Sequence, residues 1–180
     1  GIRGVERSRG LVDVYKRQRM VLLALLRKDQ ETWLFPFIAD SPLISQEMKN
    51  FKTFLRSVVV RAGKLPIRAR NPIATTSPVH SATKPTWEAP EHWIPGKPSS
   101  MRVGSFSVRG ENGKQLDFSI TSFPGDVGGL LANVNRWLGQ VGLNEVDESG
   151  LTNYVSPLEI DGKSAQLVIA ENDEKSLYAA

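Results

Sequence analysis

The stretch that decides the fold runs from Val21 to Ile38 and reads VLLALLRKDQETWLFPFI. Two apolar runs, Val21–Arg27 and Thr32–Ile38, flank the polar tetrad KDQE. Short apolar runs that are separated by a few polar residues are typical of a β-hairpin. Pro36 lacks a backbone N–H, so it predicts that the second strand lies at a sheet edge or that ladder pairing ends there.

An amphipathic helix is predicted directly after the hairpin. Ser41 and Pro42 supply an N-cap and a proline at the first helical position. Apolar residues then recur at helical spacing, namely Ile44, Met48, Phe51, Leu55 and Val58, with Phe54 widening the stripe. Burying each such side chain is worth about 1.5–3 kcal/mol, so this helix needs a sheet on which to pack.

Residues 61–86 have the composition of a flexible linker. Small polar residues dominate the segment, and four prolines interrupt it: Pro66, Pro72, Pro78 and Pro85. Apolar residues follow neither a strand period nor a helix period, so no regular element is predicted there.

The sequence after the linker again predicts regular secondary structure. Trp87 and Trp93 flank a proline, which predicts an extended segment that covers an edge of the core. A strand is predicted at Met101–Arg109, and a turn at Glu111–Lys114 leads to a second strand at Gln115–Ser122. In that second strand apolar and polar residues alternate, which indicates a sheet with one covered face.

A second helix is predicted from Asp126 to Gly142. Asp126 is placed to cap its N-terminus, and Gly142 is suited to terminate it. The predicted buried stripe consists of Leu130, Val134, Trp137 and Val141. Gly128 and Gly129 in the first turn each cost about 1 kcal/mol relative to alanine, which suggests that close packing on the sheet requires them.

The remainder of the chain has the pattern of a β-meander. A helical turn is predicted near Asp147–Tyr154, followed by strands at Leu158–Ile160, Ala165–Ala170 and Ser176–Ala180, with a turn at Asp161-Gly162 between the first two. Together the elements predict an α+β fold in which helices pack on an antiparallel β-sheet.

Composition and charge exclude several classes of protein. The chain has 180 residues and no cysteine, which excludes disulfide frameworks, thiolate nucleophiles and cysteine-ligated metals. Its net charge of +4 lies in residues 1–19, which hold six basic and two acidic residues, so the remainder is neutral. A neutral domain offers no footprint for a polyphosphate, and nucleic-acid binding is not expected. The longest apolar run, Val21–Leu26, is too short to be a transmembrane segment.

The leader at residues 1–19 is expected to be non-native. Residues 1–18, GIRGVERSRGLVDVYKRQ, resemble the translation of a sequencing adapter and depart from its usual form at Gly4 and Val12. Such strings are excluded from fold reasoning in the way that tags and fusion scars are, and the true start of the protein would then be missing. The alternative is a basic N-terminal arm or a targeting peptide, although no apolar core follows directly.

Four motifs in the rear part of the chain carry a resemblance to a known family. They are Trp87-x-Ala89-Pro90-x-x-Trp93, Met101-Arg102-x-x-x-Phe106, Phe123-Pro124-Gly125-Asp126-x-Gly128-Gly129 and Ala132-Asn133-Val134-Asn135-Arg136-Trp137-x-Gly139-Gln140. The chain resembles a group of uncharacterised bacterial extracytoplasmic tandem domains and, through them, the PsbP-like α/β/α sandwich. This resemblance implies a periplasmic or lipid-anchored protein.

The front part of the chain resembles the end of the same family pattern. Thr32-Trp33-Leu34-Phe35 matches its closing hairpin, and Lys49-x-Phe51-x-x-Phe54-Leu55-x-Ser57-Val58 matches the helix that follows, with the phenylalanine spacing shifted by one. Residues 20–60 therefore resemble the C-terminal hairpin and helix of one repeat copy, and residues 87–180 the N-terminal body of the next, in circularly permuted order. We expect the two parts to pack as one domain, with the hairpin beside Ser176–Ala180 and the helix across the sheet.

The candidate binding residues are Asp126, Asn133, Asn135, Arg136 and Trp137. The glycine-rich turn around Asp126 resembles an anion site at a helix N-terminus, but its carboxylate would repel a phosphate, which favours structural capping. The polar residues of the helix either hold it to loop carbonyls or line a polar groove, and the structural role is favoured.

No cofactor or metal is expected. None of the common catalytic motifs is present, and no acid–base pair follows from the spacing of the carboxylates. The chain has two histidines, His80 in the linker and His92 beside Trp93, which would need help from carboxylates to hold a metal. His92 is expected to be a surface residue beside a packed indole.

The expected function is a non-enzymatic binding or scaffolding module of the bacterial cell envelope, which contacts a protein or another envelope component. The alternatives are an envelope enzyme or a small-ligand sensor that uses a polar groove near Arg136. A concave pocket holding Asn133, Arg136 and a carboxylate of perturbed pKa would favour the enzyme, whereas a shallow surface would favour the module.

Overall fold

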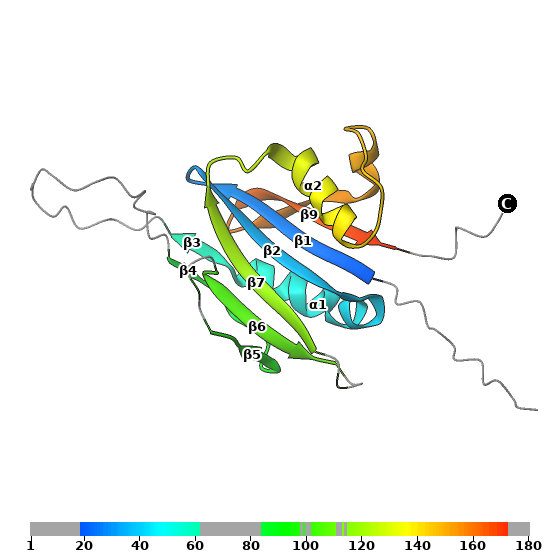
Figure 1. The fold of residues 1–180 in the computed structure, drawn as a ribbon. Coiled ribbons are helices and arrows are strands. Elements are labelled where there is room, and N and C mark those ends of the chain that lie inside the picture. The colour runs from blue at the N-terminus through cyan, green and yellow to red at the C-terminus, as the bar shows by residue number, and fades with distance from the viewer. Residues whose placement is uncertain are drawn as a thin grey trace, which may run out of the picture.

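The computed structural model describes residues 19–61, 84–97, 99, 102–110, 113 and 115–172 (Figure 1). Its strands are β1 (Arg19–Lys28), β2 (Glu31–Asp40), β3 (Val59–Arg61), β4 (Lys84–Thr86), β5 (Trp93–Pro95), β6 (Gly104–Arg109), β7 (Gln115–Pro124), β8 (Val155–Ile160) and β9 (Lys163–Glu171). Its helices are α1 (Ser41–Ser57), α2 (Gly129–Gln140) and the 3₁₀ helix η1 (Gly150–Asn153). The predicted α+β class is confirmed.

Seven strands form one antiparallel sheet in the order β5-β6-β7-β2-β1-β9-β8. Figure 1 shows α1 and α2 on opposite faces of this sheet. The apolar run of β1 supplies both faces, because Leu22, Ala24 and Leu26 belong to the cluster under α1, while Val21, Leu23 and Leu25 belong to the cluster under α2. A strand that is covered on both faces needs a continuous apolar run, which explains why this one does not alternate.

The β1–β2 hairpin lies in the interior of the sheet, between β9 and β7. Strand β1 pairs with β2 and β9, and β2 pairs with β1 and β7, so neither strand is an edge. The predicted neighbour of the hairpin, Ser176–Ala180, lies outside the described residues; within them, the neighbours of the hairpin are β9 and β7. Pro36 falls between Leu34, opposite Thr121, and Phe37, opposite Phe118, where the ladder with β7 is interrupted as predicted.

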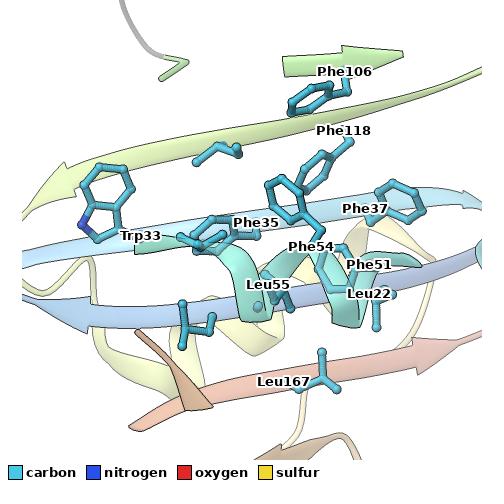
Figure 2. Close-up of a cluster of buried hydrophobic side chains, with 14 of the residues drawn as sticks. Leu22, Trp33, Phe35, Phe37, Phe51, Phe54, Leu55, Phe106, Phe118 and Leu167 are labelled. Carbon is cyan, nitrogen blue, oxygen red and sulfur yellow. The ribbon is translucent and has the colours of Figure 1, made fainter. Parts of the chain in front are cut away.

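Helix α1 packs aromatic rings of the front segment, residues 19–61, against rings of the rear segment, residues 84–172. Phe54 is fully buried, and its ring centroid lies 5.2 Å from that of Phe118 on β7 and 5.3 Å from that of Trp93 on β5. Figure 2 shows Phe51, Phe54 and Leu55 packed over the strands. The helix begins one residue earlier than predicted, since Asp40 is its N-cap and the Ser41 hydroxyl instead donates to the Glu171 carboxylate.

The ends of the predicted linker are ordered strands. Val59 pairs with Thr86, and Arg61 pairs with Lys84, in the small β3–β4 sheet. The two ends of the connection at 62–83 therefore lie side by side. The first and last described residues also lie side by side, because the Asn172 N–H donates to the Arg19 carbonyl over 3.0 Å. Residues 62–83 and the predicted turn around 111–114, apart from position 113, lie outside the described residues.

The β1–β2 turn contains a strained residue, which gives a stability prediction. Asp29 and Gln30 both have positive φ, 54° and 62°, as a type I′ turn requires. Holding Gln30 there costs about 1–2 kcal/mol, and glycine would avoid that cost but gain entropy in the unfolded state. We expect Gln30→Gly to raise the free energy of unfolding by about 0.5–1 kcal/mol in urea denaturation.

The β8–β9 turn supplies the matched control. Gly162 has φ +66° in an equivalent turn, and a Cβ there would meet nothing within 4 Å. Gly162→Gln should therefore lower the free energy of unfolding through backbone strain alone. Equal effects of the two substitutions, in the same direction, would contradict this account of the turns.

Candidate functional site

Asp126 caps α2 from outside the N-cap position. One carboxylate oxygen of Asp126 accepts a hydrogen bond from the Gly129 N–H over 2.8 Å, and the other lies 3.1 Å from the Arg27 guanidinium. The N-cap itself is Gly128, so the prediction that Asp126 is the N-cap is wrong by two residues. Both carboxylate oxygens are engaged within the fold, which agrees with the structural role favoured for this residue.

The two glycines at the start of α2 are required by backbone conformation and not by close packing. Gly128 has φ +90° and Gly129 has φ +77°, which L-residues adopt only with strain. A Cβ on Gly129 would meet nothing within 4 Å, and one on Gly128 would meet only the Ala132 Cβ at 3.4 Å. The predicted packing role is therefore wrong. At the other end, Gly142 terminates α2 as predicted, with the Leu143 N–H bonded to the Leu138 carbonyl over 3.0 Å.

Asn133 and Asn135 hold α2 to its neighbouring loops. The Asn133 amide donates to the carbonyls of Val127, over 3.0 Å, and Gly129, over 2.7 Å. Asn135 both donates to the Val146 carbonyl and accepts from the Val146 N–H, each over 2.9 Å. Apart from the bond to Gly129, which lies within α2, these are the loop contacts that the sequence favoured over a polar groove.

Arg136 and Trp137 complete the predicted set and diverge in the structure. Arg136 is exposed, and among the described residues it has no recorded hydrogen bond or ion pair. Trp137 is half-buried and packs against the cluster under α2, with its indole N–H buried and unpaired within the described part. In the described part of the chain, the five predicted residues thus make separate contacts.

A pair of substitutions on α2 separates structural from exposed residues. Asn135→Ala removes both hydrogen bonds to Val146 and should lower the free energy of unfolding by about 1–3 kcal/mol. Arg136→Ala, next in the chain, should change it by less than about 0.5 kcal/mol. Denaturant titration of both variants gives the comparison, and a larger loss for Arg136→Ala would contradict these assignments.

Two surface depressions are lined by residues other than the five candidate binding residues. The first, of about 540 Å³, lies at the β1–β2 turn and is lined by Arg27, Lys28, Asp29, Gln30, Glu31 and Gly125. The second, of about 450 Å³, lies between the end of β2 and the start of β7 and is lined by Ile38, Ala39, Asp40, Leu43, Gln115, Leu116 and Asp117. Neither depression is lined by Asn133 or Arg136.

A buried glutamate on α1 is the polar contact that the sequence analysis missed. Glu47 accepts hydrogen bonds from the Trp93 indole over 3.0 Å and from the Asn50 amide over 3.0 Å, and its other oxygen lies 2.9 Å from His92 Nε2. Burial raises the pKa of Glu47, but these hydrogen bonds outweigh burial and the pKa is lowered below 4.5. The signal was an acidic residue within the apolar stripe, three residues after Ile44.

A second polar contact joins the β1–β2 turn to the β8–β9 turn. The Lys28 ammonium donates to the Asp161 carboxylate and to the Val60 carbonyl, and the same carboxylate accepts from the Val60 N–H over 3.1 Å. The hydrogen bond from Lys28 lowers the pKa of Asp161 below its ordinary value. Like Glu47, this ion pair connects residues 19–61 with residues 84–172, so both contacts stabilise the fold.

No group of three or more acidic or histidine side chains that could hold a metal is found in the described residues. Within the same part of the chain, no helix has the length and apolar character needed to span a bilayer. No family model, curated protein or solved structure matches the sequence or its fold.

Proposed function

We propose that this chain is a non-enzymatic binding module that contacts a protein partner, as part of a bacterial cell-envelope protein. The observation that carries the proposal is the opening between β2 and β7, whose lining combines apolar side chains with two carboxylates. A partly open surface of mixed character suits contact with a protein better than chemistry on a small substrate. The place in the cell envelope is supported by the family resemblance described above.

The enzyme and sensor alternatives both depend on a groove near Arg136. The polar neighbours of Arg136 on α2 engage loop backbone, since Asn133 and Asn135 each make two hydrogen bonds within the fold. Side chains that are fixed in this way support the helix. This observation favours the module over its two rivals.

Site-specific photo-crosslinking tests the proposal. The full chain, exported to the periplasm of a bacterial host, carries a photoreactive phenylalanine analogue at Asp117, Asp29 or Arg136, one position at a time. The control carries it at the exposed Glu148. The proposal predicts a discrete adduct from at least one of the three test positions that the control does not give. Identical adducts from all four positions, or none, would contradict it.

A further inference from the structure

Two buried polar atoms on α2 have no hydrogen-bond partner among the described residues. One is the side-chain carbonyl oxygen of Asn133, Oδ1, and the other is the indole nitrogen of Trp137, Nε1. Asn133 is 1% exposed, and Trp137 packs against the cluster under α2. Leaving a buried polar atom unpaired costs free energy, so a native fold that holds two of them on one helix requires an explanation.

The two atoms are complementary in their hydrogen bonding. An amide oxygen accepts hydrogen bonds, and an indole N–H donates them. The orientation of the Asn133 amide is fixed by its nitrogen, which donates to the carbonyls of Val127 and Gly129 over 3.0 and 2.7 Å. Turning the amide over would place its oxygen against two other acceptors. Within the described part of the chain, Asn133 therefore offers an unused acceptor and Trp137 an unused donor.

Helical geometry places these two side chains next to each other. Asn133 and Trp137 are four residues apart in α2, so they are neighbours on one face of the helix. Side chains of a helix lean toward its N-terminus, which brings the Trp137 ring back over the turn that carries Asn133. Figure 1 shows α2 lying over one face of the sheet, and its buried residues are Asn133, Val134 and Leu138. The pair therefore lies at the margin of the cluster under α2.

A hydroxyl group is the chemical group that satisfies both atoms at once. Its oxygen accepts from the Trp137 N–H, while its hydrogen is donated to the Asn133 oxygen. A carboxylate accepts from Trp137 but has no hydrogen for Asn133, and an ammonium donates to Asn133 but accepts nothing from Trp137. Buried water molecules make about two to four hydrogen bonds to protein, and this pair of side chains supplies two of them.

We infer that Asn133 and Trp137 form a binding site for a single hydroxyl group, which bridges Asn133 Oδ1 and Trp137 Nε1. The hydroxyl belongs to a water molecule or to a small alcohol, since both present the same donor and acceptor. Two of the five candidate binding residues then share one ligand. This site goes beyond the proposed contact with a protein partner and does not depend on it.

NMR of the full chain, labelled with ¹⁵N, tests the site through the indole N–H of Trp137. The chain has four tryptophans, and the Trp137 resonance is assigned as the one that is lost when position 137 carries an analogue without the N–H. We expect a nuclear Overhauser cross peak between this N–H and water, with the sign of a molecule that tumbles with the protein. The control is the Trp93 N–H, which donates to the Glu47 carboxylate over 3.0 Å and should give no such peak.

Added methanol distinguishes the two sources of the hydroxyl group. If the site accepts an alcohol, the water peak of the Trp137 N–H should be replaced by a peak to the methyl protons of methanol. If the site holds water alone, the water peak should persist as methanol is added. Either result supports a hydroxyl site and identifies the molecule that fills it, whereas no cross peak from this N–H to water or to methanol would overturn the inference.

A tryptophan analogue with sulfur in place of the indole N–H keeps the ring and removes only the donor. Removing a donor that has a partner weakens the fold, whereas removing one without a partner is neutral or stabilising. We expect the analogue at position 137 to raise the equilibrium constant of unfolding about threefold or more in urea denaturation. The matched control at position 93 removes an N–H whose acceptor is Glu47 and should act in the same direction.

Two outcomes of this substitution would overturn the inference. An unchanged or smaller unfolding constant at position 137 would show that the Trp137 N–H has no partner in solution. A larger constant without any cross peak to water or methanol would show that the indole donates directly to Asn133, with no hydroxyl group between them.

Discussion

Phe54→Ala is expected to lower the free energy of unfolding by about 3–5 kcal/mol, a large part of the total for a domain of this size. The ring of Phe54 is fully buried on α1 and contacts Trp87, Trp93, Phe106 and Phe118 of the rear segment. Removing it leaves a cavity at the place where the two segments meet. Guanidinium denaturation followed by tryptophan fluorescence measures the loss.

Val103→Ala is the control for that substitution. Val103 is 38% exposed, so its truncation should change the free energy of unfolding by less than about 0.5 kcal/mol. A loss below about 1 kcal/mol for Phe54→Ala would mean that α1 does not pack on the rear segment as described.

Glu47→Leu is expected to cost about 1–3 kcal/mol at neutral pH and to flatten the acid dependence of stability. The cost arises because the buried indole N–H of Trp93 loses its acceptor. The pKa of Glu47 is lower in the folded chain than the ordinary value of 4.5. Its stabilising contribution is therefore complete above about pH 4.5 and is lost as pH falls through the lower, folded-state pKa.

Urea denaturation of the unaltered chain and of the Glu47→Leu variant, at a series of pH values between neutrality and pH 3, measures the free energy of unfolding of both proteins. The lowered pKa of Asp161 adds acid dependence to both proteins, so the difference between their curves isolates Glu47. Glu148→Leu, at an exposed site, should leave the curve in place. A Glu47→Leu curve that runs parallel to that of the unaltered chain down to pH 3 would show that the carboxylate is not held as described.

Local patterns in the sequence predicted most of the elements. The β1–β2 hairpin, both helices, the strand at β7 and the β8–β9 hairpin all follow from periodicity and turn chemistry, which depend on neighbouring residues. The position of the hairpin within the sheet did not follow, because strand pairing is decided between residues far apart in the chain. The continuous apolar run at Val21–Leu26 was the available signal, since only a strand covered on both faces requires it.

The candidate site was predicted less well than the fold. The roles favoured for Asp126, Asn133 and Asn135 agree with their backbone contacts. The opening between β2 and β7 was not predictable, because it arises where one interior ladder ends while both strands continue. Such a break depends on how two strands diverge in space, and neither strand carries a sequence signal for it.

The central claim is that residues 19–61 supply the two central strands and one helix of a fold that residues 84–172 cannot complete alone. The most direct measurement divides the chain within 62–83, whose two ends lie side by side, and produces residues 1–72 and 73–180 as separate polypeptides. The account predicts that neither unfolds cooperatively alone and that together they form a one-to-one complex with one cooperative transition. Cooperative unfolding of 73–180 by itself, unchanged when 1–72 is added, would contradict it.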